Sequence, residues 1–322
     1  MNDADANRRF HRAVYLAGPT ASGKTAVGVA LARRIGAEVI ALDALTLYRG
    51  MDIGTAKPTP RERGRVPHHL IDVLEPWESA SVADYRDRAA AVLSDLETRH
   101  VPAMFVGGTP MYLKTLLRGL FDGPGAVPDL RLELEEEAAR IGDPAMHARL
   151  AALDPATAAR IHPNDRRRVV RALEVIAATG RPFSEQRGEH ETPAPAGVAV
   201  FALDRPRDEL HRRINARVGQ MFDAGLVDEV RRLRDAPRPI GPVASQGVGY
   251  REVLDMLAGE FGEAEAMERI RARTRQFAKR QTTWFRGLSE VEFFPVPHDE
   301  PAEQTAARLA QRLERRDPIC SP

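Results

Sequence analysis

Three short apolar runs occur in the first part of the chain, at residues 13–17, 38–42 and 101–106. Apolar runs of this length, each followed by Gly or Asp, are typical of buried strands. Residues 25–35 and 82–99 instead carry their apolar side chains at helical spacing, which predicts two helices. Strands that alternate with helices in this way predict an α/β fold with a parallel sheet covered by helices on both faces.

The pattern changes near residue 125. From Asp129 to Thr179 every segment has helical spacing, and an apolar run at 198–203 then returns as a strand. Long helices follow from Asp208 onward. The sequence therefore predicts an α/β core interrupted by an all-helical insertion. The expected parts are a frayed polar lead at 1–12, the first part of the core at 13–124, the helical insertion domain at 125–190, the second part of the core with basic C-terminal helices at 196–312, and a tail at 313–322.

Four local expectations accompany this organisation. Residues 50–66 are rich in Gly, Pro, Lys and Arg and predict a long loop of the functional or mobile kind. Residues 189–197 predict a linker, and Asn164 is expected to cap the last helix of the insertion. The pair His68-His69 is interpreted as structural, because adjacent side chains point in different directions and no third ligand has zinc-like spacing.

The composition excludes several classes of protein. Hydrophobic residues make up 43% and charged residues 29% of the chain, which argues against disorder throughout. No apolar run approaches the roughly 18 residues of a membrane-spanning helix, and residues 1–12 lack the apolar segment of a secretory signal. The single cysteine, Cys320, excludes structural disulfides and cysteine-held zinc. A cytoplasmic protein with no membrane partner is therefore expected.

The segment Gly-Pro-Thr-Ala-Ser-Gly-Lys-Thr at 18–25 fits the P-loop pattern G-x-x-x-x-G-K-[ST] and lies between a predicted strand and a predicted helix. Its glycines let backbone amides approach phosphates, and the helix N-terminus adds a partial positive charge. Lys24 is expected to neutralise phosphate oxygens, and the Thr25 hydroxyl is expected to bind Mg²⁺. The expected polyphosphate-binding residues are Gly18, Pro19, Thr20, Ala21, Ser22, Gly23, Lys24 and Thr25.

An ordinary P-loop ATPase places an acidic residue after another strand to hold Mg²⁺. Here the third predicted strand is followed by Gly107, Gly108 and Thr109, whereas the second ends at Asp43. Because the carboxyl ends of parallel strands share one edge of the sheet, Asp43, Thr109 and the P-loop are expected to share a pocket. Arg217 lies beside an apolar helical stripe, so it needs an anionic partner, either a core carboxylate or a substrate phosphate.

The formal net charge is only +1, from 47 Lys and Arg against 46 Asp and Glu, and at first argues against a nucleic-acid partner. The charge is unevenly spread, however. Residues 269–286 hold seven basic residues and no acid, and residues 166–171 hold a second cluster of arginines. A single basic run is more often a solvated face. Two runs, in separate parts of the chain, favour an interaction with a nucleic-acid backbone.

Several further motifs occur in a recognisable order with these residues. They are Met51–Pro58 (MDIGTAKP), His68–Leu70, Gly107–Tyr112 (GGTPMY), Asn164–Glu174 (which includes NDxxR and RALE), Gly247–Tyr250 (GVGY) and Lys279–Arg286 (KRQTTWFR). Together the motifs closely resemble the bacterial tRNA dimethylallyltransferase family, from about residue 13 to about residue 294. The P-loop alone would fit many families, but the MDIGTAKP and KRQTTWFR segments together fit few.

The resemblance implies that a dimethylallyl group passes from dimethylallyl diphosphate to the exocyclic amine of adenine 37, beside the anticodon of tRNA. It implies that Asp43 is the general base and that Thr109 meets the bridging oxygen of the leaving diphosphate. The P-loop residues, with Arg217 and Mg²⁺ on Thr25, would hold the diphosphate. The insertion domain would grip the anticodon arm, and the enzyme would be a monomer. The implied tRNA-binding residues are Asp43, Ala44, Leu45, Thr46, Arg131, Arg167, Arg168, Arg171, Gln246, Gly247, Gly249, Tyr250, Arg251, Lys279, Arg280, Gln281, Trp284 and Arg286.

One departure from the family pattern affects the expected site. The family usually has Asp-Ser after the second strand, and this chain has Asp43-Ala44, which removes a hydroxyl near the expected adenine. Two other enzyme classes remain as alternatives: a P-loop kinase for small molecules, which does not need the basic C-terminal run, and an isopentenyltransferase for free adenine nucleotides, which does not need the helical insertion. A non-catalytic RNA-binding module is a third alternative, but it has no use for Asp43 and Thr109.

Overall fold

The computed structural model describes residues 3–64, 66–120, 123–186 and 192–315. The chain divides into two compact units, one made of Met1–Leu117 and Pro193–Pro322, and one made of Arg118–Thr192. The first unit has these elements: α1 (Asp3–Phe10), β1 (Val14–Ala17), α2 (Lys24–Ile35), β2 (Glu38–Leu42), α3 (Pro60–Arg63), β3 (His68–His69), α4 (Val82–Thr98), β4 (Ala103–Gly107), α5 (Pro110–Arg118), β5 (Ala199–Asp204), α10 (Arg207–Asp223), α11 (Leu226–Arg234), η3 (Ala244–Gln246), α12 (Tyr250–Leu257), α13 (Glu263–Arg286), β6 (Glu292–Pro295) and α14 (Ala302–Glu314).

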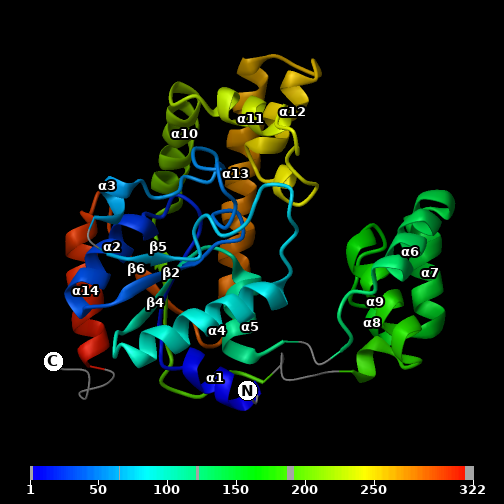
Figure 1. Cartoon of the computed structure of the whole chain (residues 1–322), viewed down its shortest axis with the longest axis horizontal. Coiled ribbons are helices and arrows are strands. Elements are labelled where there is room, and N and C mark those ends of the chain that lie inside the picture. Colours follow the sequence, from blue (N-terminus) through cyan, green and yellow to red (C-terminus); the bar gives the residue numbers. More distant parts are fainter. Residues whose placement is uncertain (1–2, 65, 121–122, 187–191, 316–322) are drawn as a thin grey trace. The chain divides into compact units, whose positions relative to one another are not determined.

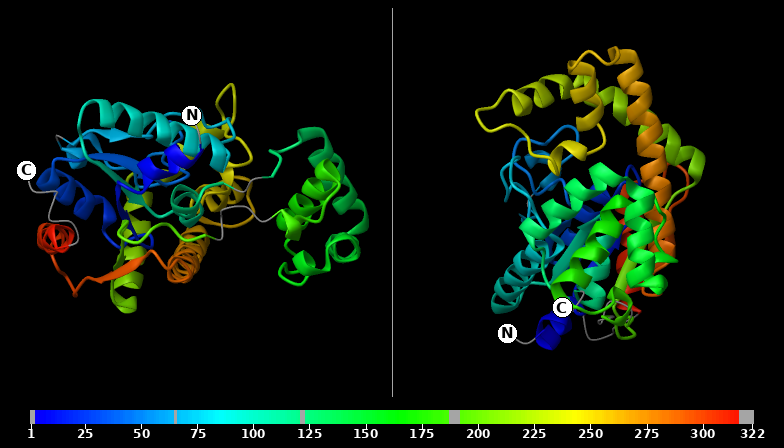
Figure 2. Two further views of the ribbon diagram at one scale, coloured as in Figure 1. Left: turned by 90° about the horizontal axis from the view of Figure 1, so that it is seen from below. Right: turned by 90° about the vertical axis from the view of Figure 1, so that its right-hand side faces the viewer.

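The first unit is built on a six-stranded parallel sheet in the order β3-β2-β4-β1-β5-β6. Helices cover both faces (Figures 1 and 2). On one face α2 and α14 bury Leu31 and Leu309 against the sheet, and on the other α4 and α5 bury Leu93 and Leu113. The expected α/β fold with a doubly covered parallel sheet is therefore confirmed.

The strands β1, β2, β4 and β5 match the four predicted apolar runs, and β2 has the predicted bounds. The two edge strands, β3 and β6, were not predicted. The pair His68-His69 forms β3, where His69 Nε2 lies 2.6 Å from Glu38 Oε2 and His68 Nδ1 lies 2.8 Å from Val66 O. Arg99 also donates to the Glu38 carboxylate. This hydrogen bond is the largest cause of the lowered pKa of Glu38, which is about 2.

One expectation for this unit was wrong. The N-terminal segment is not a frayed lead, because Asp3–Phe10 form α1 and Phe10 is fully buried against the core. The described residues of the segment 50–66 form a loop, as predicted, apart from the short helix α3, and this loop is held to the core. The Lys57 ammonium, almost fully buried, donates to Asp72 Oδ1 at 2.6 Å, and the Glu229 carboxylate accepts from the amides of Asp52, Ile53 and Gly54.

The second unit consists of α6 (Pro128–Ile141), α7 (Asp143–Leu153), α8 (Pro155–Ala158), α9 (Arg166–Thr179) and the 3₁₀ turn η1 (Phe183–Glu185). Its own apolar core contains Leu134, Met146, Leu150 and Leu173. The structure corrects the expected cap of α9, because Asp165, and not Asn164, accepts a side-chain hydrogen bond from the Arg168 amide. The expected linker at 189–197 lies partly outside the described residues. Among the described residues, no helix is long and apolar enough to cross a membrane.

Candidate active site at the carboxyl edge of the sheet

The P-loop turns from β1 into α2 with three residues in the left-handed region or near it. Gly18 has φ +143°, and a Cβ there would lie 3.2 Å from the backbone of Leu203 on β5. Ala21 has φ 63°, and Gly23 (φ 91°) is the N-cap of α2. The hydroxyl of Ser22 is fully buried and has no hydrogen-bond partner among the described residues. A helix N-terminus behind a tight glycine-containing turn is suited to bind an anion.

Lys24 extends back over this turn, and its ammonium donates to Pro19 O at 2.8 Å. Burial lowers its pKa to about 8, and the positive charge of Arg217 adds to this effect, whereas the negative charge of Asp43 opposes it. The three side chains therefore lie close enough to influence one another's charge. An anion bound in the turn would favour the protonated form of Lys24.

Arg217 reaches the same place from α10. Its Nη1 lies 3.5 Å from the Thr20 hydroxyl, and burial lowers its pKa. No carboxylate of the described residues forms an ion pair with it. Of the two partners left open by the sequence, a core carboxylate and a bound phosphate, the structure favours the phosphate.

Asp43 and Thr109 follow β2 and β4, which are neighbouring strands, so the two residues meet at the carboxyl edge of the sheet. Asp43 Oδ1 accepts from the Leu45 amide, and Thr109 Oγ1 accepts from the Ala44 amide, each at 3.0 Å. The Thr109 amide in turn donates to Leu42 O at 3.1 Å. The two strand ends are thus joined by one backbone hydrogen bond and by the bond from the Ala44 amide to the Thr109 side chain.

The residues of this edge fit a magnesium ion held mainly by a ligand. No group of three His, Cys, Asp or Glu side chains among the described residues could hold a metal without help. Thr25 offers one hydroxyl at the start of α2, next to the anion-binding turn. Mg²⁺ commonly keeps several waters and binds through substrate phosphates and few protein ligands, so the Thr25 hydroxyl fits an ion that a bound diphosphate would bring.

Comparisons with known proteins agree with this geometry. The family model described as IPP transferase matches residues 46–288, and a model described as isopentenyl transferase matches residues 12–68. Among curated relatives, the tRNA dimethylallyltransferase of Geobacter metallireducens is 46% identical over 89% of this chain and 93% of its own. That of Anaeromyxobacter dehalogenans (strain 2CP-C) is 47% identical over 95% of this chain and 100% of its own. The chain belongs to the tRNA dimethylallyltransferase family.

Solved structures support the same assignment. The tRNA isopentenylpyrophosphate transferase of Bacillus halodurans has a TM-score of 0.69 and 39% identity, covering 95% of this chain and 98% of its own. A eukaryotic dimethylallyltransferase acting on tRNA has a TM-score of 0.78 and 26% identity, covering 95% of this chain and 80% of its own. The P-loop core with a parallel sheet is thus the fold of this family.

The family resemblance also predicts RNA-binding residues, and the structure separates them into exposed and buried groups. Residues 43–46 lie beside the loop before α12, since a Cβ on Gly247 would be 2.9 Å from Leu45 Cδ1. Gln246, at the end of η3, and Arg251, in the first turn of α12, are exposed, and Arg251 donates to Gln246 Oε1 at 3.2 Å. Five of the predicted tRNA contacts are instead buried. They are Thr46 after β2, Gly247, Gly249 and Tyr250 before and at the start of α12, and Gln281 on α13.

The basic run on α13 is divided into two halves. Arg269, Arg271 and Arg273 pair with glutamates, and Arg275 donates to Asn215. Lys279, Arg280 and Arg286 are exposed and form no ion pair with a described residue. Arg280 lies over the ring of Phe277, and Arg286 lies over the ring of Phe293. Trp284, which comes between the two arginines in the sequence, is half-buried. Arg275 and the second half therefore keep a positive charge that no carboxylate of the described residues pairs with.

The arginines of the helical unit divide in a similar way. The carboxylate of Glu174, which is fully buried, accepts from Arg131 at 2.7 Å and from Arg171 at 2.8 Å. Arg171 also donates to Pro124 O at 2.6 Å. Arg167 and Arg168 are exposed, and Arg168 has only the neighbouring Asp165 as an ion-pair partner. Arg131 and Arg171 thus have structural contacts that the sequence did not indicate.

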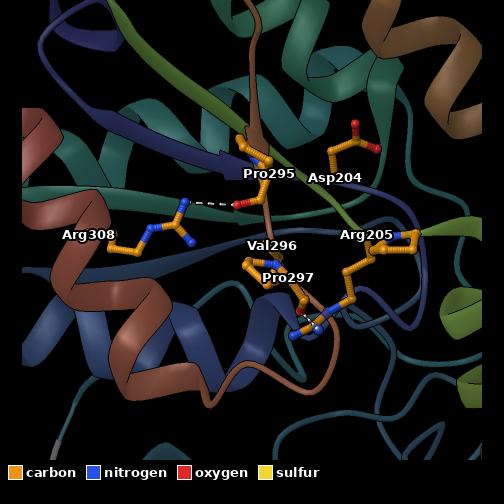
Figure 3. Close-up of a pocket in the computed structure, with 7 residues that line it drawn as sticks. Asp204, Arg205, Pro295, Val296, Pro297 and Arg308 are labelled. Atoms are coloured by element: carbon orange, nitrogen blue, oxygen red, sulfur yellow. Dashed lines mark hydrogen bonds between the residues drawn. The ribbon is translucent and has the colours of Figure 1, made fainter.

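A pocket of about 420 Å³ lies at the carboxyl ends of β5 and β6 (Figure 3). Its two guanidinium groups are already engaged. Arg308 binds Glu300 and Pro295 O, and Arg205 binds Glu209 at 2.8 Å. Arg205 Nε also donates to Ser22 O at 2.8 Å, so this side chain links the pocket wall to the P-loop. No motif in the sequence predicts this contact. The lining residues are Asp204, Arg205, Pro206, Pro295, Val296, Pro297 and Arg308.

Proposed function

We propose that this protein transfers a dimethylallyl group from dimethylallyl diphosphate to the exocyclic amine of adenosine 37 in tRNA, giving N6-dimethylallyladenosine and diphosphate. The observation that carries the proposal is the meeting of Asp43 and Thr109 beside a P-loop, with no acid after β4. Membership of the tRNA dimethylallyltransferase family supports it independently.

The proposed chemistry follows from the groups at this edge. The amine nitrogen attacks C1 of the dimethylallyl group, the C1–O bond breaks, and its electron pair leaves on the diphosphate. An adenine amine is a poor nucleophile because its lone pair is delocalised into the ring, so a base that removes the proton assists the attack. Asp43 is the proposed base. One of its oxygens accepts from Leu45 N, which orients the carboxylate.

The leaving diphosphate is stabilised by groups that are already in place. Lys24, Arg217 and the amides of residues 18–25 would bind its oxygens, and Mg²⁺ on Thr25 would neutralise further charge. The Thr109 hydroxyl oxygen already accepts from Ala44 N, so the hydroxyl proton would be the group that Thr109 offers to the bridging oxygen. Preorganised donors of this kind lower the barrier more than mobile water does.

Substrate RNA is proposed to lie on the exposed cations. Reaching an adenine amine requires an unstacked base, as single-stranded loops of RNA permit. The proposed phosphate contacts are Lys279, Arg280 and Arg286 on α13, with Arg167 and Arg168 on α9. The residues proposed to surround the base are Ala44, Leu45, Gln246 and Arg251. We propose that the enzyme acts as a monomer in the cytoplasm.

The direct test uses purified protein, Mg²⁺, dimethylallyl diphosphate and an unmodified tRNA with adenine at position 37. Nucleoside mass spectrometry should detect dimethylallyladenosine, and a tRNA with guanine at position 37 should give none. Prenylated AMP or ADP without any tRNA product would favour the free-nucleotide alternative. Transfer of a phosphoryl group from ATP to a small molecule, with no prenylation, would favour the kinase alternative.

A further inference from the structure

Gln281 lies on α13 between the exposed Lys279 and Arg280 and the buried Phe285, and it was expected to contact tRNA. In the structure it is only 3% exposed. Its side-chain oxygen accepts from the Thr20 amide at 2.9 Å, and its side-chain nitrogen donates to Gly108 O at 2.6 Å. Both ends of the amide are therefore occupied by backbone groups of the active site.

These two backbone groups belong to the two parts of the proposed machinery. Thr20 lies in the P-loop, and its hydroxyl is 3.5 Å from Arg217 Nη1. Gly108 immediately precedes Thr109. The Gln281 side chain thus spans the gap between the diphosphate-binding turn and the residue that would donate to the leaving oxygen.

The local sequence is shaped for this contact. A Cβ on Gly108 would lie 2.6 Å from Gln281 Nε2, 3.3 Å from Gly18 O and 3.5 Å from Lys24 Nζ. Glycine is needed at the neighbouring position 107 for a different reason, since a Cβ there would collide with the backbone of Leu42 on β2. Residue 108 therefore has no side chain at the point where the Gln281 amide and the P-loop approach it most closely.

A second contact holds α13 in the same place. Ala278, one turn before Gln281 and 2% exposed, packs with Leu210 and Ile214 of α10 and against Ala21 of the P-loop. An apolar contact and a paired amide together fix α13 over the turn. Removing the amide would leave the Thr20 N–H and the Gly108 carbonyl without their partners, and such groups are costly when buried.

The geometry points to Gln281 as a positioning residue for the diphosphate site, which fixes the P-loop relative to Thr109 and does not contact tRNA. The inference rests on the proposed function for the identity of the donor. Gln281 is therefore expected to affect the affinity for the diphosphate group and to leave the affinity for RNA unchanged.

The test compares Gln281→Met, which keeps the length and removes both hydrogen bonds, with Gln281→Glu, which keeps the acceptor and places a negative oxygen against Gly108 O. Gln276→Met, an exposed position on the same helix, is the matched control. Calorimetry measures binding of inorganic diphosphate with Mg²⁺, and steady-state kinetics give separate KM values for dimethylallyl diphosphate and tRNA. Thermal unfolding reports on the fold.

Both Gln281 variants should bind diphosphate about tenfold or more weakly and raise the KM for dimethylallyl diphosphate similarly, as expected for loss of about 1.4 kcal/mol. The KM for tRNA should stay within about twofold of wild type, since no RNA contact is removed. Gln276→Met should match wild type in all measurements. If Gln281→Met does not fold, Gln281→Asn, which keeps the amide but shortens its reach, carries the same comparison.

A raised KM for tRNA with unchanged diphosphate binding would show that Gln281 contacts RNA and would overturn the inference. Unchanged diphosphate binding with lowered thermal stability would overturn it too, by showing a purely structural role. Calorimetry needs no turnover, so it also separates the two proposals. If wild type makes no prenylated tRNA but diphosphate binding still depends on Gln281, the proposed function fails and the positioning role stands.

Discussion

The backbone amide of Ala44 donates a hydrogen bond of 3.0 Å to the side-chain oxygen of Thr109. A threonine hydroxyl has one proton to donate, and this bond occupies one of its acceptor positions. The proton is therefore free to point toward a leaving group. The bond uses the backbone of residue 44, so the alanine found here in place of the family's usual serine leaves it intact.

Replacing Thr109 with Val keeps its shape and removes the hydroxyl. We expect kcat to fall about 100-fold, because a donor that acts on developing negative charge is lost. Thr109→Ser should retain most of the activity. Thr283→Ala, at an exposed position on α13, is the control and should be neutral. A Thr109→Val enzyme with near wild-type kcat in a single-turnover assay would remove Thr109 from the reaction.

Asp43→Asn tests the proposed base. Asparagine can still accept from the Leu45 amide, so the turn at residues 43–45 should be preserved. We expect kcat to fall by about 100-fold or more, as for loss of a general base, with little change in tRNA affinity measured by filter binding. Equal losses in both quantities would mean that Asp43 mainly positions the adenine.

Much of the sheet could be predicted because buried strands leave a strong pattern. The strands β1, β2, β4 and β5 are nearly continuous apolar runs, and the first three of them lead directly to the site residues. The edge strand β3 is two histidines, and only pairing with β2 makes them a strand. No local pattern carries that information, because a strand of this length is defined by its neighbour.

The site residues also divide into those that a local pattern predicts and those that depend on distant segments. The P-loop, Asp43 and Thr109 follow predicted strands, so sequence order alone brings them to one edge. The roles of Gln281, Glu174 and Glu229 depend on tertiary contacts between distant segments. One signal was available for Glu229, which lies on the apolar stripe of α11 between Leu226 and Val230. A carboxylate on a buried helix face is expected to accept hydrogen bonds from groups of the segment that covers it.

The lowered pKa of Lys24 predicts how donor binding depends on pH. Its ordinary value is 10.5, and burial lowers it to about 8. Below pH 8 the free enzyme holds the cation that the diphosphate needs. Above pH 8 the proton is lost, so the KM for dimethylallyl diphosphate should rise, approaching about tenfold per pH unit well above the pKa. Lys24→Arg should have a flatter profile between pH 7 and 9.5, because arginine stays charged. Parallel profiles for the two enzymes would assign the dependence to another group.

The carboxylate of Glu229 holds the segment 52–54 on the core. It is 2% exposed and accepts from three backbone amides and from the Tyr250 hydroxyl, the last at 2.6 Å. Glu229→Gln would place an amide donor against these donors, so we expect the free energy of unfolding to fall by about 2–4 kcal/mol. Tyr250→Phe should cost about 1 kcal/mol. Asp228→Asn, exposed on the same helix, is the control in urea denaturation. Equal stability of the Glu229 and Asp228 variants would show that this clamp contributes little.

The arginines of α9 should give opposite results in binding and in stability. Arg167 is exposed and forms no ion pair with a described residue. Arg167→Ala should raise the KM for tRNA a few-fold and reduce its salt dependence, as for loss of one phosphate contact, with unchanged thermal stability.

Arg171→Ala should lower stability instead, because the fully buried Glu174 loses one of its two cations and the carbonyls of Pro124 and Gly125 lose their donor. Circular dichroism during heating and tRNA titrations at two salt concentrations distinguish the two effects. If Arg171→Ala weakened tRNA binding with no loss of stability, its guanidinium would be an RNA contact that happens to rest on Glu174. If Arg167→Ala left the KM and its salt dependence unchanged, the exposed end of α9 would lie outside the RNA-binding surface.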